Sequence, residues 1–454
     1  MSRKKIISLI LTVGIIGSIS QFVITHNTSA SSRKDIKVMA YKSSAKANEN
    51  GFQIDKYANI ESVAWLNESE VLTLTKKSEF KNPDSTRIIR YCSIYNLNTK
   101  ASKDFKNVDI DEFLGVSPDK KYVLYAEART IPKIGGEEWK KALDSGDLLH
   151  KNVKLLNLST GEITAVNTEK LNSDAEFIWV GKNKILANYF RKWAIIDTTG
   201  KVYADGSYKA GKLDSAWISG TDDIKDLGNS VEGKFYYTQD ENGKEGVKLC
   251  TVDIKTKEIT TIFSNQYSLH ADKKGKTIII DNFNNNGEAS SDGVYVNRTF
   301  GALVLNESGK TTQEIKLPKG ITTKGSFKSE YILSPDGSKA AYIETASCIG
   351  SNNNNNNNNP DDSIKVIDTH SGAIKEIVKL SSLKDKNAPD NYAIVKKAKQ
   401  DGSIEERRII VPQYFSNIRW DSTGTALSFT CGDSVFANNT STAPINTYIV
   451  SFDN

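Results

Sequence analysis

The chain has 454 residues, of which 38% are hydrophobic and 25% charged, a composition typical of a globular protein rather than a disordered chain. The formal net charge is +5, and Arg3, Lys4 and Lys5 supply three of these positive charges, so the rest of the chain is nearly neutral. Binding along a nucleic acid needs a clustered excess of Lys and Arg, so the composition excludes nucleic acid as the default partner.

The first 30 residues have the pattern of a targeting segment. Three basic residues precede an apolar stretch from Ile6 to about Ile24, and a small-residue segment follows that ends at Ala30. This order predicts a secretory signal peptide. An uncleaved membrane anchor is the alternative, because about 17 to 25 apolar residues can span a bilayer. We therefore expect an extracytoplasmic protein that is secreted or is held at the membrane by this segment alone.

Residues 31–50 are polar and show no apolar periodicity, which predicts a flexible spacer between the targeting segment and the folded body. The folded domain is expected over residues 51–454. The short basic leader and the frequent use of Lys and Asn indicate a bacterial origin.

The folded body is built from a repeated unit. Short runs of alternating apolar and polar residues recur between turn residues, which indicates strands rather than helices. The unit begins with two strands around a Ser-Pro-Asp-Gly-like turn, as in YILSPDGSKAAYIE from Tyr331. Two more strands around a Thr-Gly-like turn follow, as in IKVIDTHSGAIKEIV from Ile364. Copies of the unit begin near Ser62, Phe113, Phe177, Ser215, Ser268, Tyr331 and Asn417.

Four-stranded sheets repeated in this way bury both faces of every sheet only if they close into a ring. The last copy ends after its third strand, Thr447 to Phe452, and the segment from Phe52 to Tyr57 is a candidate for the missing strand. Pairing these two segments would cover two open sheet edges. The predicted fold class is therefore all-β, a seven-bladed β-propeller closed by an N-terminal strand that completes the last blade. Six or eight blades are the alternatives.

The segments from Tyr331 and Ile364 quoted above resemble the WD40-like propeller repeat of TolB-type proteins. A similar repeat forms the propeller half of prolyl-oligopeptidase-type enzymes. The resemblance covers most of residues 52–454 and implies the fold, but such propellers serve as scaffolds, receptors and enzyme lids. The sequence contains no Gly-x-Ser-x-Gly elbow and no hydrolase domain after the repeats, so we expect no peptidase chemistry of that kind.

Long insertions are expected to gather on one face of the ring. Loops between the second and third strands, and between one unit and the next, open on the same face. Functional residues concentrate on loops that a rigid scaffold holds, so this face is the predicted binding face. Five insertions fall on it: Ala128 to Lys151, Asn282 to Arg298, Ala346 to Asp362, Ser381 to Gln413 and Cys431 to Asn446. The insertion from Thr221 to Glu232 falls on the other face.

Acidic residues stand near the start of the innermost strand in five units: Glu61, Glu112, Glu176, Asp214 and Glu330. If they converge at the mouth of the channel, their negative potential would attract cations or cationic groups, and these acids are therefore our candidate ligand-binding residues. The alternative is that each is a solvated residue at the end of a loop.

Four tryptophans stand at matching places near the end of the first strand of their units: Trp65, Trp179, Trp217 and Trp420. This recurrence predicts packing between units rather than a ligand cage.

Two further features are interpreted from the sequence. Residues Glu137 to Leu149 are expected to form a short helix carrying Trp139, which either anchors a partner or packs on the ring. Cys348 and Cys431 end equivalent strands of adjacent blades, and an exported protein permits a disulfide between them. Free buried thiols are the alternative.

We identify no catalytic residues, no metal site and no cofactor in the sequence. His150, His270 and His370 lie in parts of the repeat that cannot form one site. The leading hypothesis is an exported, non-catalytic propeller that binds a protein, peptide or cell-envelope ligand on the face with the insertions. The alternative is an exported, glycan-directed hydrolase that uses two of the channel-mouth acids, since such chemistry needs only a pair of carboxylates. A structural surface protein without a defined ligand is a third possibility.

Overall fold

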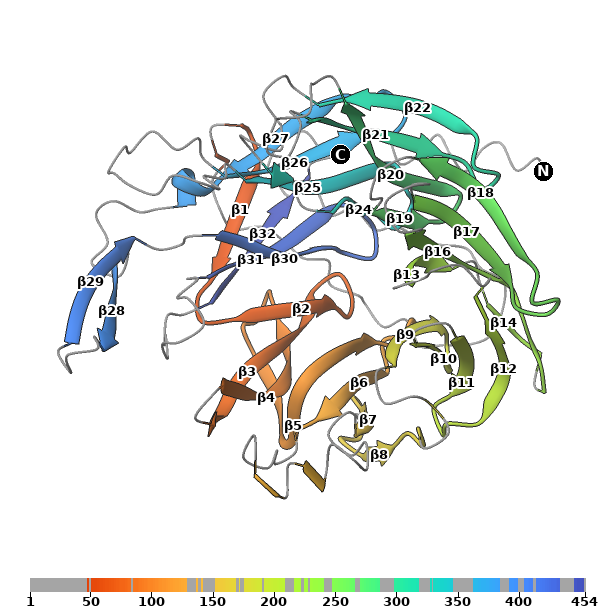
Figure 1. Ribbon diagram of the computed structural model, residues 1–454. Coiled ribbons are helices and arrows are strands. Elements are labelled where there is room, and N and C mark those ends of the chain that lie inside the picture. Colours follow the sequence, from red (N-terminus) through yellow and green to blue (C-terminus); the bar gives the residue numbers. More distant parts are fainter. Residues whose placement is uncertain are drawn as a thin grey trace, which may run out of the picture. The chain divides into compact units, whose positions relative to one another are not determined.

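The computed structural model describes residues 47–452 except 49, 83–84, 129–135, 138–139, 142–151, 169–170, 172–174, 190–191, 209–215, 222–223, 228, 241–246, 266–269, 286–297, 318–326, 329, 346–361, 384–391, 399–403, 411–413 and 433–444. Antiparallel β-strands make up most of these residues (Figure 1). The strands fall into modules of four, which we number one to seven in chain order, and each module has a first, second, third and fourth strand.

Modules one and two share a strand. Module one contains β2 (Glu61–Trp65), β3 (Glu70–Asn82), β4 (Ser85–Asn96) and the beginning of β5 (Ser102–Val116). Module two contains the end of β5, β6 (Tyr122–Glu127), β7 (Val153–Asn157) and β8 (Ile163–Ala165). Because β5 runs without interruption from one module into the next, these strands form one seven-stranded sheet. The sequence predicted two separate strands here.

Modules three to five each form a four-stranded sheet. Module three contains β9 (Glu176–Gly181), β10 (Lys184–Tyr189), β11 (Lys192–Asp197) and β12 (Val202–Ser207). Module four contains β13 (Ala216–Thr221), β16 (Lys234–Asp240), β17 (Val247–Asp253) and β18 (Ile259–Asn265). Module five contains β19 (Ala271–Lys274), β20 (Thr277–Asn285), β21 (Arg298–Leu305) and β22 (Thr311–Lys316).

Modules six and seven follow the same order. Module six contains β24 (Ile332–Leu333), β25 (Lys339–Thr345), β26 (Ser363–Asp368) and β27 (Ile374–Lys379), and β23 (Phe327–Lys328) also pairs with β25. Module seven contains β30 (Tyr414–Trp420), β31 (Ala426–Gly432), β32 (Asn446–Ser451) and β1 (Gln53–Tyr57). The expected pairing of the N-terminal strand is confirmed, since Gln53 to Tyr57 run antiparallel to Ser451 to Thr447.

Buried apolar side chains join the modules. The described residues belong to one compact unit, residues 39–454, and they contain seven hydrophobic clusters that each span two modules. The clusters join modules one and two (with Cys92 and Tyr125), two and three (Leu155 and Phe177), three and four (Trp193 and Phe235), four and five (Leu249 and Ile278), five and six (Ala302 and Leu333), six and seven (Ile364 and Phe429), and seven and one (Ile449 and Trp65).

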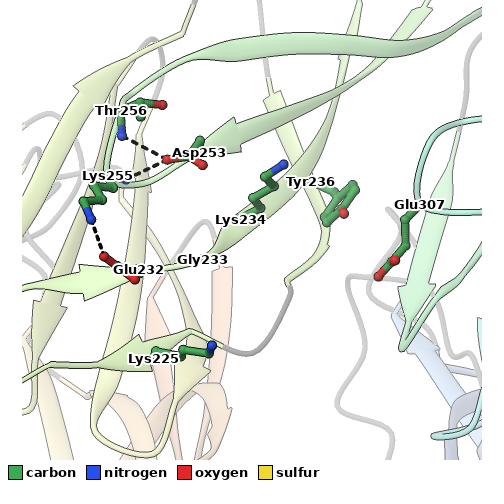
Figure 2. A pocket seen from close by; sticks show the side chains of 9 residues that line it. All are labelled: Lys225, Glu232, Gly233, Lys234, Tyr236, Asp253, Lys255, Thr256 and Glu307. Atoms are coloured by element: carbon green, nitrogen blue, oxygen red, sulfur yellow. Dashed lines mark hydrogen bonds and ion pairs between the residues drawn. The ribbon is translucent and has the colours of Figure 1, made fainter.

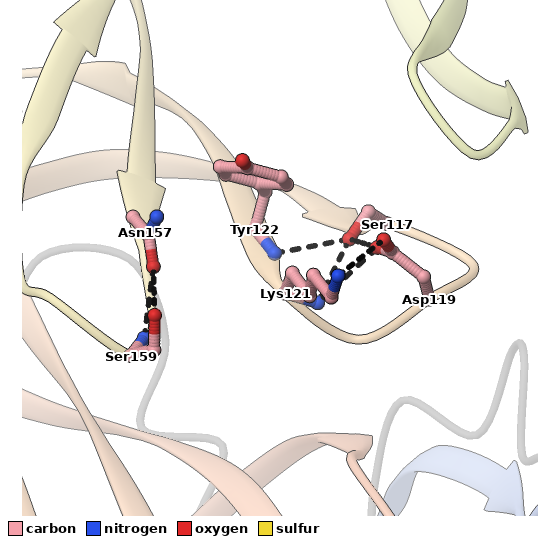
Figure 3. A network of polar contacts seen from close by, with 6 residues as sticks. All are labelled: Ser117, Asp119, Lys121, Tyr122, Asn157 and Ser159. Atoms are coloured by element: carbon pink, nitrogen blue, oxygen red, sulfur yellow. Dashed lines mark hydrogen bonds and ion pairs between the residues drawn. The ribbon is translucent and has the colours of Figure 1, made fainter. Parts of the chain in front are cut away.

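Short polar side chains fix the turns of the repeat. In module two the Ser117 hydroxyl donates to the Asp119 carboxylate at 2.7 Å and accepts the backbone N–H of Tyr122 at 3.0 Å (Figure 3). Ser334 repeats this arrangement with Asp336 in module six. The turn after a third strand is held by an Asn or Asp side chain, as where Asn157 accepts the N–H of Ser159 at 2.9 Å (Figure 3). Such side chains replace the backbone partners that a tight turn lacks, which explains the recurrence of these residue types.

Three smaller elements lie outside the modules. The insertion in module four forms a hairpin of β14 (Lys225–Asp226) and β15 (Val231–Glu232). A second hairpin, β28 (Tyr392–Ala398) with β29 (Ile404–Ile410), lies within the insertion after module six, where the sequence predicted no strands. Between them in the chain, η1 (Leu380–Leu383) is a short 3-10 helix. None of the described helical segments has the length and apolar character needed to cross a membrane.

Candidate functional site

The first strands can be compared level by level, because each is paired with a second strand in a known register. We number the residues of each second strand from its first residue. A residue of the first strand lies at "rung n" if it is paired with residue n of the second strand. Rung two is occupied by Trp65 opposite Val71, by Trp179 opposite Ile185 and by Trp420 opposite Leu427. The partners Val71, Ile185 and Leu427 belong to clusters shared with the preceding module. Directly paired residues share a face of the sheet, so rung two faces the preceding module.

Rung five brings together residues that the sequence proposed for a binding site. Its residues are Glu61 opposite Leu74, Glu112 opposite Ala126, Glu176 opposite Asn188, Trp217 opposite Thr238, and Ser416 opposite Thr430. In module five His270 lies at rung five, because its carbonyl accepts the N–H of Asp281, the fifth residue of β20, at 3.1 Å. Successive side chains of a strand alternate between faces, so rung five faces the following module, opposite to rung two. Three of the five predicted acids therefore lie at one level and on one face.

Glu61 is the most buried of these acids. Its carboxylate lies 3.5 Å from the guanidinium of Arg90, which belongs to the third strand of module one. Burial raises the pKa of Glu61, and the nearby positive charge of Arg90 lowers it in part. At this position the negative charge is therefore largely balanced within the protein.

Glu112 and Glu176 are exposed at rung five of modules two and three. Asn188, the cross-strand partner of Glu176, accepts a hydrogen bond from the buried hydroxyl of Tyr208. The negative charge of Glu176 adds to burial in raising the pKa of this tyrosine. Both residues thus lie in paired strands rather than in loops, and at Glu112 the register shifts on either side of the residue.

In module four the residue at rung five is Trp217. Asp214, the predicted acid of this module, lies outside the described residues. The sequence comparison also aligned Trp217 with Trp65, Trp179 and Trp420, and this alignment was wrong. Trp217 pairs with the fifth residue of its second strand, whereas the other three pair with the second residue. The insertion between β13 and β16 obscured this register in the sequence.

Glu330 pairs with a residue of the neighbouring module. Its carboxylate lies 3.0 Å from Nδ1 of His270, and both side chains are more than half exposed. His270 precedes β19 and Glu330 precedes β24, two first strands that contact each other. This pair connects rung five of module five with module six.

Asp272 lies in β19, two residues after His270, and was not singled out from the sequence. Its carboxylate accepts the N–H of Leu333 in β24 at 2.7 Å. Burial raises the pKa of Asp272, and the negative charge of Glu330 adds to this effect, while Lys274 opposes it. Burial lowers the pKa of Arg419 in β30, and the charge of Asp272 opposes that change. An acid inside a predicted strand, as in Ala-Asp-Lys-Lys, was the only sign of this position in the sequence.

In modules two and five the other end of the first strand carries lysines. Lys120 lies in the turn that leads to β6, and Lys274 is the last residue of β19. Burial lowers the pKa of Lys120, and the positive charge of Lys274 adds to the effect. Lys273 is buried, donates to the carbonyl of Gly275 at 2.6 Å and lies 4.6 Å from the ring centre of Tyr236. Basic groups thus stand at this end of the first strand in modules two and five.

A cavity of about 470 Å³ lies at the turn end of module four (Figure 2). Three lysines and three acids line it, together with Gly233, Tyr236 and Thr256. Lys255 forms an ion pair with Glu232, and Asp253 accepts the backbone N–H groups of Lys255 and Thr256 (Figure 2). The three lysines and three acids balance in charge, so the cavity has no strong preference for one sign of charge. Across the described part of the chain, no three potential metal ligands gather.

The tryptophans at rung two pack between modules, as predicted for three of the four. The indole N–H of Trp420 donates to the carbonyl of Ile332 in module six at 2.9 Å, and that of Trp65 to Arg419 in module seven at 3.3 Å. Trp179 lies against Gly115 of module two. Trp217 differs, because 46% of its surface is exposed.

Several predicted features fall wholly or partly outside the described residues. Glu137, Lys140 and Lys141 are helical, as expected, but Trp139 itself is not among the described residues. Cys92 and Cys250 are free and buried. Cys431 is also a buried free thiol, and Cys348 lies outside the described residues, so the disulfide stays a prediction. Most of the five insertions on the predicted binding face also lie outside them.

No protein-family model matches the sequence, and no curated protein matches it. Solved structures do show similarity. The β-propeller domain of the Trilobed protease from Pyrococcus furiosus, described as having an open velcro topology, is 11% identical, with 87% of this chain and 93% of that chain covered and a TM-score of 0.45. TolB from Acinetobacter baumannii is 12% identical, with 84% and 80% covered and a TM-score of 0.30.

A prolyl endopeptidase is also similar, at 12% identity and a TM-score of 0.45. The match covers 86% of this chain and 48% of the prolyl endopeptidase, so the chain spans about half the length of that protein. These neighbours are β-propeller proteins. The present chain has an all-β architecture of several antiparallel sheets.

Proposed function

We propose that residues 51–454 form a seven-bladed β-propeller in which the modules are the blades and β1 closes the ring. Two observations support this arrangement. A hydrophobic cluster joins each module to the next, including module seven to module one. Several first strands also contact each other across module boundaries, among them β2 with β30 and β19 with β24. In such a ring the first strands line a central channel, and rung five lies at its mouth on the side of the insertions.

The protein is proposed to act outside the cytoplasm as a non-catalytic binding protein of the TolB-like type, for a protein, peptide or cell-envelope ligand. The signal-like segment before Ala30 supports export. The observation that carries the binding role is the common level and face of Glu61, Glu112 and Glu176. With Glu330 nearby, the exposed acids Glu112 and Glu176 concentrate negative potential on the face that the sequence predicts for the insertions. The ligand therefore presents a cationic group to the channel mouth.

Binding of a cationic peptide tests this function. Acetylated hexalysine amide is titrated into the protein at low ionic strength, and its affinity is compared between wild type and the double variant Glu112→Gln, Glu176→Gln. We expect the variant to bind about 5-fold more weakly, because each exposed ion pair contributes about 0.2–1 kcal/mol. The matched control is Glu162→Gln with Glu258→Gln, two exposed acids in turns at the opposite end of the modules. Equal affinity in both double variants would rule out the acids as the binding residues.

Export has its own test. Expression in a bacterial host, followed by N-terminal sequencing of the protein outside the cytoplasm, should give a first residue shortly after Ala30 if the segment is cleaved. A membrane-bound protein that still begins at Met1 would indicate the anchor instead. Full-length protein that stays in the cytoplasm would contradict export.

A hydrolase is the second candidate, and Asp272 favours it. Burial raises the pKa of Asp272, the negative charge of Glu330 adds to this effect, and glycoside hydrolysis uses a pair of acids of which one has a raised pKa. Turnover of a polysaccharide panel that is lost in Asp272→Asn and in Glu330→Gln would support this function. A panel without turnover by the wild type would leave the binding role as the one to pursue.

A further inference from the structure

Trp217 is exposed and faces the following module. Thr238, its cross-strand partner, and Tyr236 lie two residues apart in β16 and therefore on the same face. Tyr236 belongs to the cluster shared with module five, so Trp217 faces module five. The three other tryptophans of first strands face the preceding module, where Trp65 and Trp420 donate to its backbone. Trp217 is the one of these four that is nearly half exposed, at 46% of the residue surface.

The neighbours of Trp217 along rung five are charged and polar. Module three, on one side, presents the exposed carboxylate of Glu176 at the same rung. On the other side module five presents His270 and its ion pair with Glu330, and β13 contacts β19 directly. An exposed indole at the same rung as an exposed carboxylate provides two attractions for a cation, the charge of the acid and the electron-rich face of the ring.

We propose that Trp217 is the selectivity residue of the rung-five site and that its ring stacks against the guanidinium of an arginine side chain of a protein or peptide ligand. This inference rests on the function proposed above and names the ligand class for it. Trp is the best aromatic partner for a cation. A guanidinium is planar and weakly hydrated, so it stacks on a ring and pairs with carboxylates at the same time. A hydrated inorganic cation or a compact ammonium gains less from the indole face.

The test compares three probes on the full chain: acetylated hexaarginine amide, acetylated hexalysine amide and Ca²⁺. Each is titrated calorimetrically into wild type, Trp217→Ala and Trp217→Phe. We expect hexaarginine to bind more tightly than hexalysine, and Trp217→Ala to weaken hexaarginine about 5-fold or more, because cation–π contacts are of this size. Trp217→Phe should keep most of the affinity, and any Ca²⁺ affinity should be the same in all three proteins.

The control variant is Leu227→Ala, which removes another exposed hydrophobic side chain, 53% exposed, from the β14–β15 hairpin. It should bind hexaarginine as the wild type does. A second readout is indole fluorescence, since a ligand-induced change in emission should be present in the wild type and absent in Trp217→Phe. Far-ultraviolet circular dichroism and thermal melting confirm that each variant is folded.

Each outcome decides the proposal. If Trp217→Ala binds hexaarginine as tightly as the wild type does, the proposed role of Trp217 is overturned. If the double variant Glu112→Gln, Glu176→Gln still binds more weakly in that case, the proposed function stands without a role for Trp217. An equal loss for Ca²⁺ and hexaarginine in Trp217→Ala also overturns that role, because selectivity would then not come from the ring. If the folded wild type binds neither peptide, the proposed function fails and this inference fails with it.

Discussion

Ile54 in β1 lies directly opposite Val450 in β32, so the first described strand of the chain is paired with the last. Both side chains contribute to the hydrophobic cluster between modules six and seven. The same end of the chain is held by Asn48, whose side-chain amide donates to the carbonyl of Ile377 in module six at 2.9 Å. The N-terminal strand therefore contributes both to a sheet and to a contact between modules.

Removal of β1 should destabilise the domain. A chain that begins at Asn59 lacks the buried rings of Phe52 and Tyr57, and each such ring contributes about 1.5–3 kcal/mol. We expect the free energy of unfolding in urea to fall by at least about 3 kcal/mol. The uncovered edge of β32 should also cause self-association, visible by analytical ultracentrifugation. A chain that begins at Ala47 keeps β1 and serves as the control, and equal stability of the two chains would contradict this role of β1.

Gly309→Ala should show how closely modules four and five approach. Gly309 has a φ of +79°, and a Cβ there would lie 2.0 Å from the carbonyl oxygen of Ile262 in β18. The control is Gly275→Ala, where φ is +52° and no atom lies within 4 Å of the added Cβ. The left-handed backbone costs about 1–2 kcal/mol in both variants, and overpacking adds about 1–3 kcal/mol in Gly309→Ala alone. The free energy of unfolding, measured by thermal unfolding, should therefore be about 1–3 kcal/mol lower for Gly309→Ala than for Gly275→Ala. Equal melting temperatures would show that the modules do not touch there.

Stability should fall in acid partly because of the turn aspartates. Asp253 and Asp368 each accept two backbone N–H bonds, at 2.9 and 3.1 Å and at 2.8 and 3.0 Å, and these bonds lower their pKa from the ordinary value of 3.8. A carboxylate whose pKa is lower in the folded than in the unfolded state stabilises the fold above the unfolded value. This stabilisation is lost as the pH falls through about 3.8 toward the lower folded pKa.

The double variant Asp253→Asn, Asp368→Asn should therefore lose less stability than the wild type when the pH falls from 5 to 3, as measured by urea unfolding. Asn preserves the turn, as it does at Asn157 and Asn306. The reciprocal variant Asn157→Asp, Asn306→Asp should lose more stability over the same range. Identical pH dependence in all three proteins would mean that these turns do not contribute to acid unfolding.

The repeated unit and its limits could be predicted from the sequence, because alternating strands and Ser-Pro-Asp-Gly or Thr-Gly turns depend on local residue preferences. The pairing of Gln53 to Tyr57 with the last strand could also be predicted, since an incomplete last unit needs a partner strand. The level of Glu61, Glu112 and Glu176 followed from the same repeat.

The remaining features depend on register and on contacts between distant strands. Trp217 was misaligned because the insertion after β13 hides which residue of β16 it faces. Arg90 reaches Glu61 from the third strand of its module, a distance along the chain that no local pattern encodes. The continuity of β5 from module one into module two was missed because two repeats with a short link read as separate strands.

The pairing of the chain ends is the claim on which the ring and the rung-five site depend, and a cross-link tests it most directly. Opposite residues of antiparallel strands have Cβ atoms about 4.5–5.5 Å apart, close enough for a disulfide after a small adjustment. In the double variant Ile54→Cys, Val450→Cys, oxidation followed by peptide mass spectrometry should find position 54 joined to position 450 within one monomer. The control Ile54→Cys, Ile449→Cys should give no such bridge, because Ile449 is opposite Asp55 and faces the other side of the sheet. A bridge in the control alone, bridges only between molecules, or no bridge in either variant would contradict the account.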